Sequence, residues 1–144
     1  MKDILVLNGP NLNMLGLRPK EHYGSKTLAD INELIKEEAK DTDFNIHFFQ
    51  SNNEGDLVTE IQNAVLKSYK AIIINPAAYT HTSVAIHDAL EMFNGIKIEV
   101  HLSKVDERED FRKINYVRSV CDVCFSGKFE ASYIEAIDYL KNAL

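Results

Sequence analysis

The chain has 144 residues, a mass of 16.4 kDa and a formal net charge of −6, from 22 acidic and 16 basic residues. Its 45% hydrophobic and 26% charged content argues against intrinsic disorder. The acidic balance argues against nucleic acid or an anionic membrane as a partner, because both bind positively charged surfaces. The length is typical of one domain, which we expect to span residues 1–144 and to bury a core without disulfides.

The N-terminus lacks the apolar run and cleavage site of a signal peptide, and no stretch approaches the ~20 apolar residues that span a bilayer. We therefore expect a cytoplasmic protein. Cys121 and Cys124 have the C-x-x-C spacing of redox and zinc sites, but they lie late in the chain and have no second pair. Buried, inert thiols are the favoured interpretation.

Short apolar runs alternate with helical periodicity along the chain. In chain order, the pattern predicts strand 4–7, helix 27–40, strand 46–49, helix 54–67, strand 71–74, helix 83–93, strand 96–100, a charged loop with one short helix over 103–119, strand 120–125 and helix 129–142. Alternating strands and helices, with nearly continuous apolar runs in the strands, indicate a parallel sheet covered on both faces. The expected fold is α/β, a flavodoxin-like doubly wound sandwich with a five-stranded parallel sheet.

In such a sheet, ligands bind beyond the carboxyl ends of the strands. The segments at that edge are residues 8–26, 50–55, 75–83 and 101–112, and three of the four are rich in polar side chains. These segments are where we look for chemistry.

The first segment is a long loop of about seventeen residues, where two to six are usual. Gly16 and Gly24 bracket Arg18 and Tyr23, as hinges would bracket a lid. Neither nucleotide-binding glycine motif occurs in it. The structural alternative makes Tyr23 a packing residue and Arg18 a solvated charge, and the loop length alone favours neither.

The third and fourth segments carry the candidate histidines. His81 follows Asn75 at the mouth of the predicted crevice, among hydroxyl residues that we interpret as helix caps. Glu99 and His101 are two apart on a strand and share a face, so the carboxylate can orient the imidazole and fix its tautomer. This pairing is what a general acid or base requires.

Only four of the basic residues are arginines, the side chain best shaped to hold a carboxylate or phosphate. Arg108 and Arg112 would share a helix face if that stretch is helical. For Arg108 and Arg118, the favoured interpretation is surface pairing with acidic neighbours such as Glu109 or Asp110.

Several blocks of this sequence, in order and over nearly the whole chain, resemble the type II 3-dehydroquinate dehydratases. The blocks are residues 5–12 (LVLNGPNL) with Gly16, Arg18, Tyr23 and Gly24, residues 50–52 and 54–55, residues 74–83 (INPAAYTHTS), residues 87–89, residues 99–103 (EVHLS), Arg108, Phe111 and Arg112. The departure is at residues 125–130 (FSGKFE), which keep one glycine where the family has a glycine-rich stretch.

The resemblance implies anti elimination of water from 3-dehydroquinate through an enolate, giving 3-dehydroshikimate in the shikimate pathway, without a cofactor or a Schiff-base lysine. It implies that Tyr23 abstracts the C2 proton with Arg18 beside it, and that Asn11 holds a water at the enolate oxygen. It further implies that His101, oriented by Glu99, protonates the departing hydroxyl.

The resemblance also implies a set of substrate-binding residues and an assembly, with no metal. The binding residues are Asn75, His81, Leu102, Ser103 and Arg112, joined by Asp88 from a neighbouring subunit. The implied assembly is a homododecamer built from trimers.

Two other functions stay open on the residues alone. One is a flavodoxin-like module that binds FMN or a small anion without turnover. The other is a phosphate-handling lyase that uses Arg108 and Arg112 as its clamp.

Overall fold

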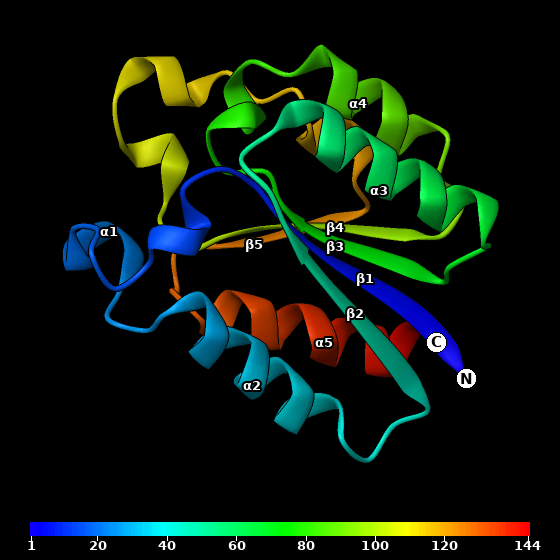
Figure 1. Cartoon of the computed structure of the whole chain (residues 1–144). Helices are drawn as coiled ribbons and strands as arrows, with labels where there is room; N and C mark the ends of the chain where they lie inside the picture. The colour runs from blue at the N-terminus through cyan, green and yellow to red at the C-terminus, as the bar shows by residue number, and fades with distance from the viewer.

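Five parallel strands form one sheet at the centre of the molecule (Figure 1), in the order β2-β1-β3-β4-β5. The computed structural model describes all residues, 1–144. The strands are β1 (Lys2–Asn8), β2 (Phe44–Gln50), β3 (Ala71–Asn75), β4 (Ile96–His101) and β5 (Val123–Ser126). All four pairings are parallel, so the predicted α/β fold with a five-stranded parallel sheet is confirmed.

Helices cover both faces of this sheet (Figure 1). Helices α2 (Leu28–Ala39) and α5 (Ala131–Ala143) pack on one face, and α3 (Glu54–Leu66) and α4 (Val84–Glu91) pack on the other. None of these helices combines the length and apolarity needed to cross a bilayer.

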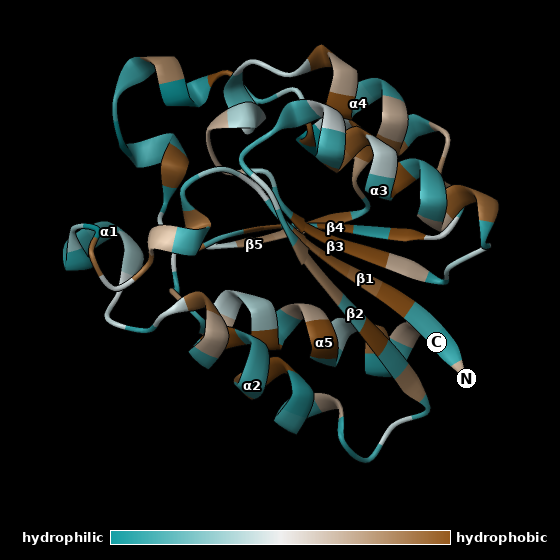
Figure 2. Cartoon of the chain, in the orientation of Figure 1, coloured by the Kyte–Doolittle hydropathy of each residue, from teal (hydrophilic) through white to brown (hydrophobic).

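Each central strand contributes side chains to two separate cores. Ile4 and Val6 belong to the core under α2 and α5, whereas Leu5 and Leu7 belong to the core under α3 and α4. Figure 2 shows the hydrophobic residues concentrated on the strands. Burial on both faces explains why the strands read as continuous apolar runs rather than as alternating patterns.

The two strands at the centre of the sheet end together. Asn8 pairs with Asn75 in register, and the Gly9 N–H donates to the Asn75 carbonyl at 2.8 Å. A Cβ atom on Gly9 would lie 2.5 Å from the Pro76 carbonyl oxygen, so a glycine is required there. From β1 the chain crosses to β2 on one side of this junction, and from β3 it crosses to β4 on the other side. The junction of β1 and β3 is therefore the topological switch point of the sheet, the place where ligands bind in such folds.

Two sequence predictions need correction. The charged segment forms three short 3-10 helices rather than one helix: η3 (Val105–Glu107), η4 (Asp110–Lys113) and η5 (Arg118–Val120). The last strand begins at Val123 rather than residue 120, because the Val120 N–H turns back to the Val117 carbonyl and pairing with β4 starts only after Asp122. A charged segment without periodicity gives no signal for such short turns.

The long first loop is also more ordered than expected. It contains η1 (Leu12–Met14) and α1 (Lys20–Tyr23), and the third loop contains η2 (Ala77–His81). Two predicted caps are confirmed, whereas the side chains of Thr80 and Thr82 cap no helix. Thr27 forms a capping box with Asp30. The Ser83 side chain likewise accepts from the Ile86 N–H.

Candidate active site

A cavity of about 120 Å³ lies beyond the carboxyl ends of the central strands, at the switch point. Most of the site residues expected from the sequence line it. Those that line it are Asn11, Arg18, Tyr23, Asn75, His81, His101, Leu102, Ser103 and Arg112. Glu99 and Asp88 do not reach the cavity wall.

The Tyr23 hydroxyl lies between two guanidinium groups. Arg18 Nη2 donates to it at 2.6 Å, and the Arg18 guanidinium carbon lies 3.6 Å from the centre of the ring. Arg108 Nη1 donates to the same oxygen at 2.9 Å. The Tyr23 oxygen thus accepts hydrogen bonds from two cations.

The position of Arg108 overturns its interpretation as a surface residue. Its side chain is 11% exposed and lines the cavity, since it extends from the end of η3 back to the loop that carries Tyr23. The resemblance block includes Arg108, but local sequence gives no signal for a contact that spans 85 positions. Its Nε–H is buried without a partner in the chain.

The cavity also holds Arg112, so three of the four arginines meet in one place in an acidic protein. Arg112 and Arg108 do not share a helix, because Arg108 precedes η4. The Arg112 Nε donates to Glu109 at 2.5 Å, so the predicted pairing with Glu109 is found chiefly at Arg112. Burial lowers the pKa of the Arg18 guanidinium, and the charge of the Tyr23 oxygen opposes that shift.

His101 lies at the end of β4 against a buried carboxylate. Its Nε2 is 2.5 Å from Glu99 Oε2, and the Glu99 side chain is fully buried. Because an ionised carboxylate only accepts, Nε2–H is the donor and Nδ1 is the nitrogen left for a ligand. Burial alone would raise the pKa of Glu99, but the bonds from His101 and Asn115 and the charge of Arg118 lower it to about 2.

Arg118 is the second arginine with unexpected partners. Its Nε donates to Glu99 at 3.1 Å and its Nη1 to Asp106 at 2.9 Å, so Glu109 and Asp110 are not its partners. The turn at η5 brings residue 118 next to β4, where the buried carboxylate of Glu99 accepts from it. Arg118 thus contacts the Glu99 carboxylate, the partner of His101, from outside the cavity.

His81 is held as a neutral ring. Its Nδ1–H donates to the Ile114 carbonyl at 2.6 Å, and burial lowers its pKa. The Nε2 atom is therefore an acceptor for a hydroxyl in the cavity.

Asn75 is fixed by a buried network that the sequence did not reveal. Its Nδ2 donates to the Tyr133 hydroxyl at 3.0 Å, and Tyr133 donates to Asn8 Oδ1 at 2.6 Å. The Asn75 Oδ1 accepts from the Ala77 N–H. Periodicity marks Tyr133 only as an apolar helix position, but burial raises its pKa and keeps it a neutral donor.

The remaining cavity residues contribute mainly backbone. Asn11 has a left-handed backbone with φ 69°, a conformation that asparagine tolerates, and its N–H donates to Asn52. Leu102 and Ser103 follow β4 directly, and the Leu102 carbonyl accepts from the Phe129 N–H. Their chain therefore forms the wall next to His101.

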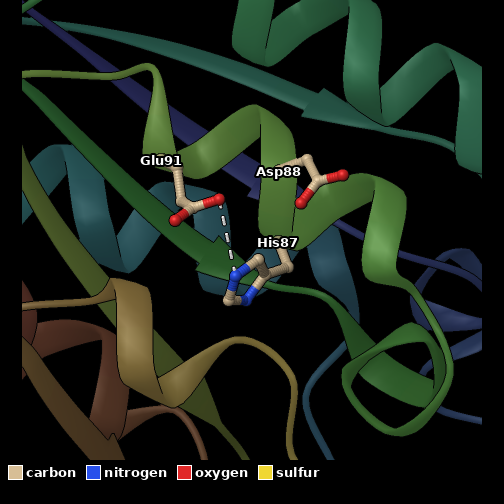
Figure 3. A group of neighbouring side chains, drawn as sticks. All are labelled: His87, Asp88 and Glu91. Atoms are coloured by element: carbon tan, nitrogen blue, oxygen red, sulfur yellow. Dashed lines mark ion pairs between the residues drawn. The ribbon is translucent and has the colours of Figure 1, made fainter.

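Asp88 lies on the exposed side of α4, away from the cavity, with His87 and Glu91 (Figure 3). These are the histidine and carboxylate side chains close enough to share a metal ion. However, His87 Nδ1 donates to the Tyr116 carbonyl at 2.6 Å and Nε2 pairs with Glu91 at 3.6 Å. The Nδ1 atom is thus engaged by the chain itself, and Nε2 faces the carboxylate of Glu91.

Both cysteines are free and half-buried rather than fully buried. Burial raises the pKa of Cys121 to about 12 and that of Cys124 to about 11. Because the thiolate is the reactive form, both are poor nucleophiles at neutral pH, as expected from the sequence.

The chain was then compared with known proteins. The family model described as dehydroquinase class II matches residues 2–141. The 3-dehydroquinate dehydratase of Clostridium beijerinckii is 51% identical over 138 residues, covering 96% of this chain and 94% of that protein. The 3-dehydroquinate dehydratase of Caldicellulosiruptor bescii is 46% identical over 144 residues, covering 100% and 99%.

A solved structure agrees with these matches. The crystal structure of type II dehydroquinase from Butyrivibrio crossotus has a TM-score of 0.93 and 44% sequence identity, with 97% of each chain covered. Similarity at this level extends from the sheet through the loops around the cavity. The chain therefore belongs to the class II dehydroquinase family.

Proposed function

We propose that this protein is a 3-dehydroquinate dehydratase, a hydro-lyase that converts 3-dehydroquinate into 3-dehydroshikimate in the shikimate pathway. Family membership and the named relatives support the activity. The observation that carries the chemistry is a single cavity lined both by a tyrosine bonded to two arginines and by a histidine bonded to a buried carboxylate.

Tyr23 is the proposed base. As a phenolate it takes a proton from C2 of the substrate, and the electrons of that C–H bond move toward the C3 ketone to form an enolate. Arg18 and Arg108 support this role because their charges stabilise the phenolate before the proton moves. Asn11, also in the cavity wall, is proposed to hold a water that donates to the enolate oxygen.

His101 is the proposed acid. The enolate collapses to a C1–C2 double bond, the C1–O bond breaks, and the leaving hydroxyl takes the proton from His101 and departs as water. Glu99 orients the ring through Nε2, so the transferred proton comes from Nδ1. The cycle closes when Tyr23 returns a proton to His101 through solvent.

The substrate is a small carboxylate with several hydroxyls, and the cavity is suited to such a molecule. Arg112 and the backbone amides of Leu102 and Ser103 are proposed to bind anionic and hydroxyl oxygens. Asn75 and the neutral His81 supply directed hydrogen bonds. No cofactor, metal or lysine imine enters this proposal.

Asp88 has a role in the proposal only if several copies of the chain assemble into an oligomer. It lies on the same face of α4 as the exposed apolar residues Val84 and Met92, which are 53% and 51% exposed, and such a face suits a subunit contact. We propose a homododecamer built from trimers in which Asp88 reaches a neighbour's cavity. A cytoplasmic location is part of the same proposal.

A direct assay tests the activity. Purified protein is mixed with 3-dehydroquinate, and the ultraviolet absorbance of the conjugated enone product is followed with time. We expect turnover in the wild type and a loss of at least ~100-fold in His101→Ala, because removal of a general acid costs about 10²–10⁴-fold. Near-normal turnover in His101→Ala would refute the acid assignment.

The same preparation distinguishes the alternatives. A coloured, nucleotide-loaded protein without turnover would favour the FMN module. Treatment with borohydride in the presence of substrate is expected to leave activity intact, and inactivation would indicate a lysine imine instead.

A further inference from the structure

The carboxylate behind His101 is held by three donors at once. Glu99 Oε2 accepts from His101 Nε2 at 2.5 Å and from Asn115 Nδ2 at 2.7 Å, and Oε1 accepts from Arg118 Nε at 3.1 Å. The Glu99 side chain is fully buried, so these three groups replace all of its water. Arg118 is the one cation among the hydrogen-bond donors to this carboxylate besides the imidazole itself.

Arg118 is fixed in this position. Asn115 Oδ1 accepts from the backbone N–H groups of Val117 and Arg118, so the same asparagine that holds Glu99 also shapes the turn carrying the arginine. On the outer side, Arg118 Nη1 donates to Asp106 Oδ2 at 2.9 Å. Its side chain is 42% exposed, and solvent therefore screens part of its charge.

This arrangement bears on how easily His101 gives up a proton. A buried carboxylate with no other partner holds an imidazolium strongly, because the ion pair loses its attraction when the proton leaves. A guanidinium on the opposite carboxylate oxygen offsets part of that attraction. A general acid works best when its proton is neither too tightly nor too loosely held at the working pH.

Other titratable groups also lie near the Glu99–His101 pair. On the cavity side these are His81 and Arg112; on the sheet side, the thiols of Cys121 and Cys124. Burial raises the pKa of both thiols and lowers that of His81, so these three groups are uncharged at neutral pH. Arg112 is engaged by Glu109.

We propose that Arg118 is a positioning residue that acts through Glu99 to set the acidity of His101 in the elimination. The inference rests on the proposed role of His101 as general acid. Arg118 does not line the cavity, so it acts on His101 through the Glu99 carboxylate that both side chains contact. Asp106, on the outer side, offsets part of the charge of Arg118.

The test is an NMR titration of ¹⁵N-histidine-labelled full-length protein without substrate, with the His101 signal assigned by its loss in His101→Ala. In Arg118→Gln, we expect the midpoint of the His101 ring titration to rise by about 0.5–1 pH unit, since a nearby like charge that disfavours the imidazolium is lost, and solvent screens part of that charge in the wild type. The alkaline limb of kcat should move by the same amount. On the plateau below that limb, where His101 is protonated in both proteins, kcat should fall by up to about three- to tenfold with KM little changed, because the proton is held more tightly.

Three variants serve as controls. Arg118→Lys keeps the charge and should retain most of the wild-type midpoint. Asp106→Asn removes a negative charge beside Arg118 and should lower the midpoint. Lys128→Gln removes an exposed cation that pairs with Glu135 at 2.6 Å, and it should leave the midpoint unchanged.

A double-mutant cycle tests whether the effect of Arg118 on His101 passes through Glu99. In a Glu99→Gln background, Arg118→Gln should shift the midpoint by less than half as much as in the wild type, because the shared carboxylate is gone. An unchanged midpoint in Arg118→Gln, or an equal shift in both backgrounds, would overturn the inference. A shifted midpoint in a protein that does not dehydrate 3-dehydroquinate would instead refute the proposed function.

Discussion

Tyr23 and His101 represent two ways of controlling a proton with neighbouring charge. At Tyr23 two arginines bond to the atom that reacts. At His101 a buried carboxylate bonds to the ring nitrogen opposite the one left for the ligand. The neighbours matter most at Tyr23, because the pKa of a free tyrosine is about 10, whereas that of a free histidine, about 6.5, already lies close to neutral pH.

Arg108 offers the first prediction at the scale of single residues. Arg108→Met removes one charge-assisted hydrogen bond from the phenol oxygen, a contribution of about 1.5–3 kcal/mol. We expect kcat to fall about 10- to 100-fold, with a smaller change in KM. Steady-state kinetics check this, with the exposed Lys128→Gln as a control variant outside the cavity. Equal losses in kcat and in affinity would argue that Arg108 only binds substrate.

The second residue-scale prediction concerns pH and stability. The pKa of Glu99 falls from an ordinary value of 4.5 to about 2 in the folded protein. A depressed folded pKa contributes stability that is present above pH 4.5 and is lost as the pH falls toward 2. The advantage of wild type over Glu99→Gln in the free energy of unfolding should therefore shrink by roughly 3 kcal/mol as the pH falls from neutral to about 2. Urea unfolding at a series of pH values measures it, and a difference independent of pH would contradict it.

At the scale of elements, helix α1 belongs to the long first loop, which the sequence suggests is a lid. Helix α1 has no buried residue, and it ends at Gly24, whose φ is +73°. A Cβ on Gly24 would lie 3.2 Å from Phe129 Cδ1, so the phenyl ring packs against the hinge. Phe129 itself has φ 52°, a left-handed conformation that costs a bulky residue about 1–3 kcal/mol. The segment that departs from the family pattern thus contacts the loop that carries Arg18 and Tyr23.

Phe129→Gly tests that contact. Glycine removes both the strained backbone and the ring against Gly24, so the free energy of unfolding should change little while the lid loosens. We expect faster trypsin cleavage after Lys20 and a KM that rises several-fold. Phe129→Leu keeps the bulk and should behave like the wild type. Equal cleavage rates in Phe129→Gly and wild type would show that the ring does not restrain the lid.

The junction of β1 and β3 gives a second element-scale prediction. Gly9→Ala should lower the free energy of unfolding by about 1–3 kcal/mol, because its Cβ would meet a backbone oxygen at 2.5 Å. Gly55→Ala is the matched control: no atom lies within 4 Å of its Cβ in helix α3, and it should stabilise by about 0.5–1 kcal/mol. Thermal unfolding of the two variants compares them directly, and equal effects would contradict the close approach.

At the scale of the whole molecule, charge is distributed unevenly. The chain has a net charge of −6, yet three of its four arginines line one cavity. The acidic total keeps large polyanions away, while the local cations favour a small carboxylate.

The proposed assembly predicts a measurable mass. Sedimentation velocity should give a particle of about twelve times the 16.4 kDa chain mass, and activity should be lost when the particle dissociates. Asp88→Asn should reduce turnover without changing the mass, because the proposed role of Asp88 lies in a neighbour's cavity. A fully active monomer would contradict both expectations.

The sequence by itself determined the sheet, the four main helices and the caps at Thr27 and Ser83, because hydrophobic periodicity and capping residues are local signals. It also placed Glu99 and His101 together, since side chains two apart on a strand share a face. The resemblance added the other expected site residues, most of which line the cavity.

Only the tertiary structure decided the roles of Arg108 and Arg118, the network of Asn8, Asn75 and Tyr133, and the contact of Phe129 with the lid. The physical reason is the same in each case. The partners of long side chains and irregular turns depend on which segments the fold brings together. In these cases the partners lie more than ten positions apart in the sequence, so no periodic pattern predicts them.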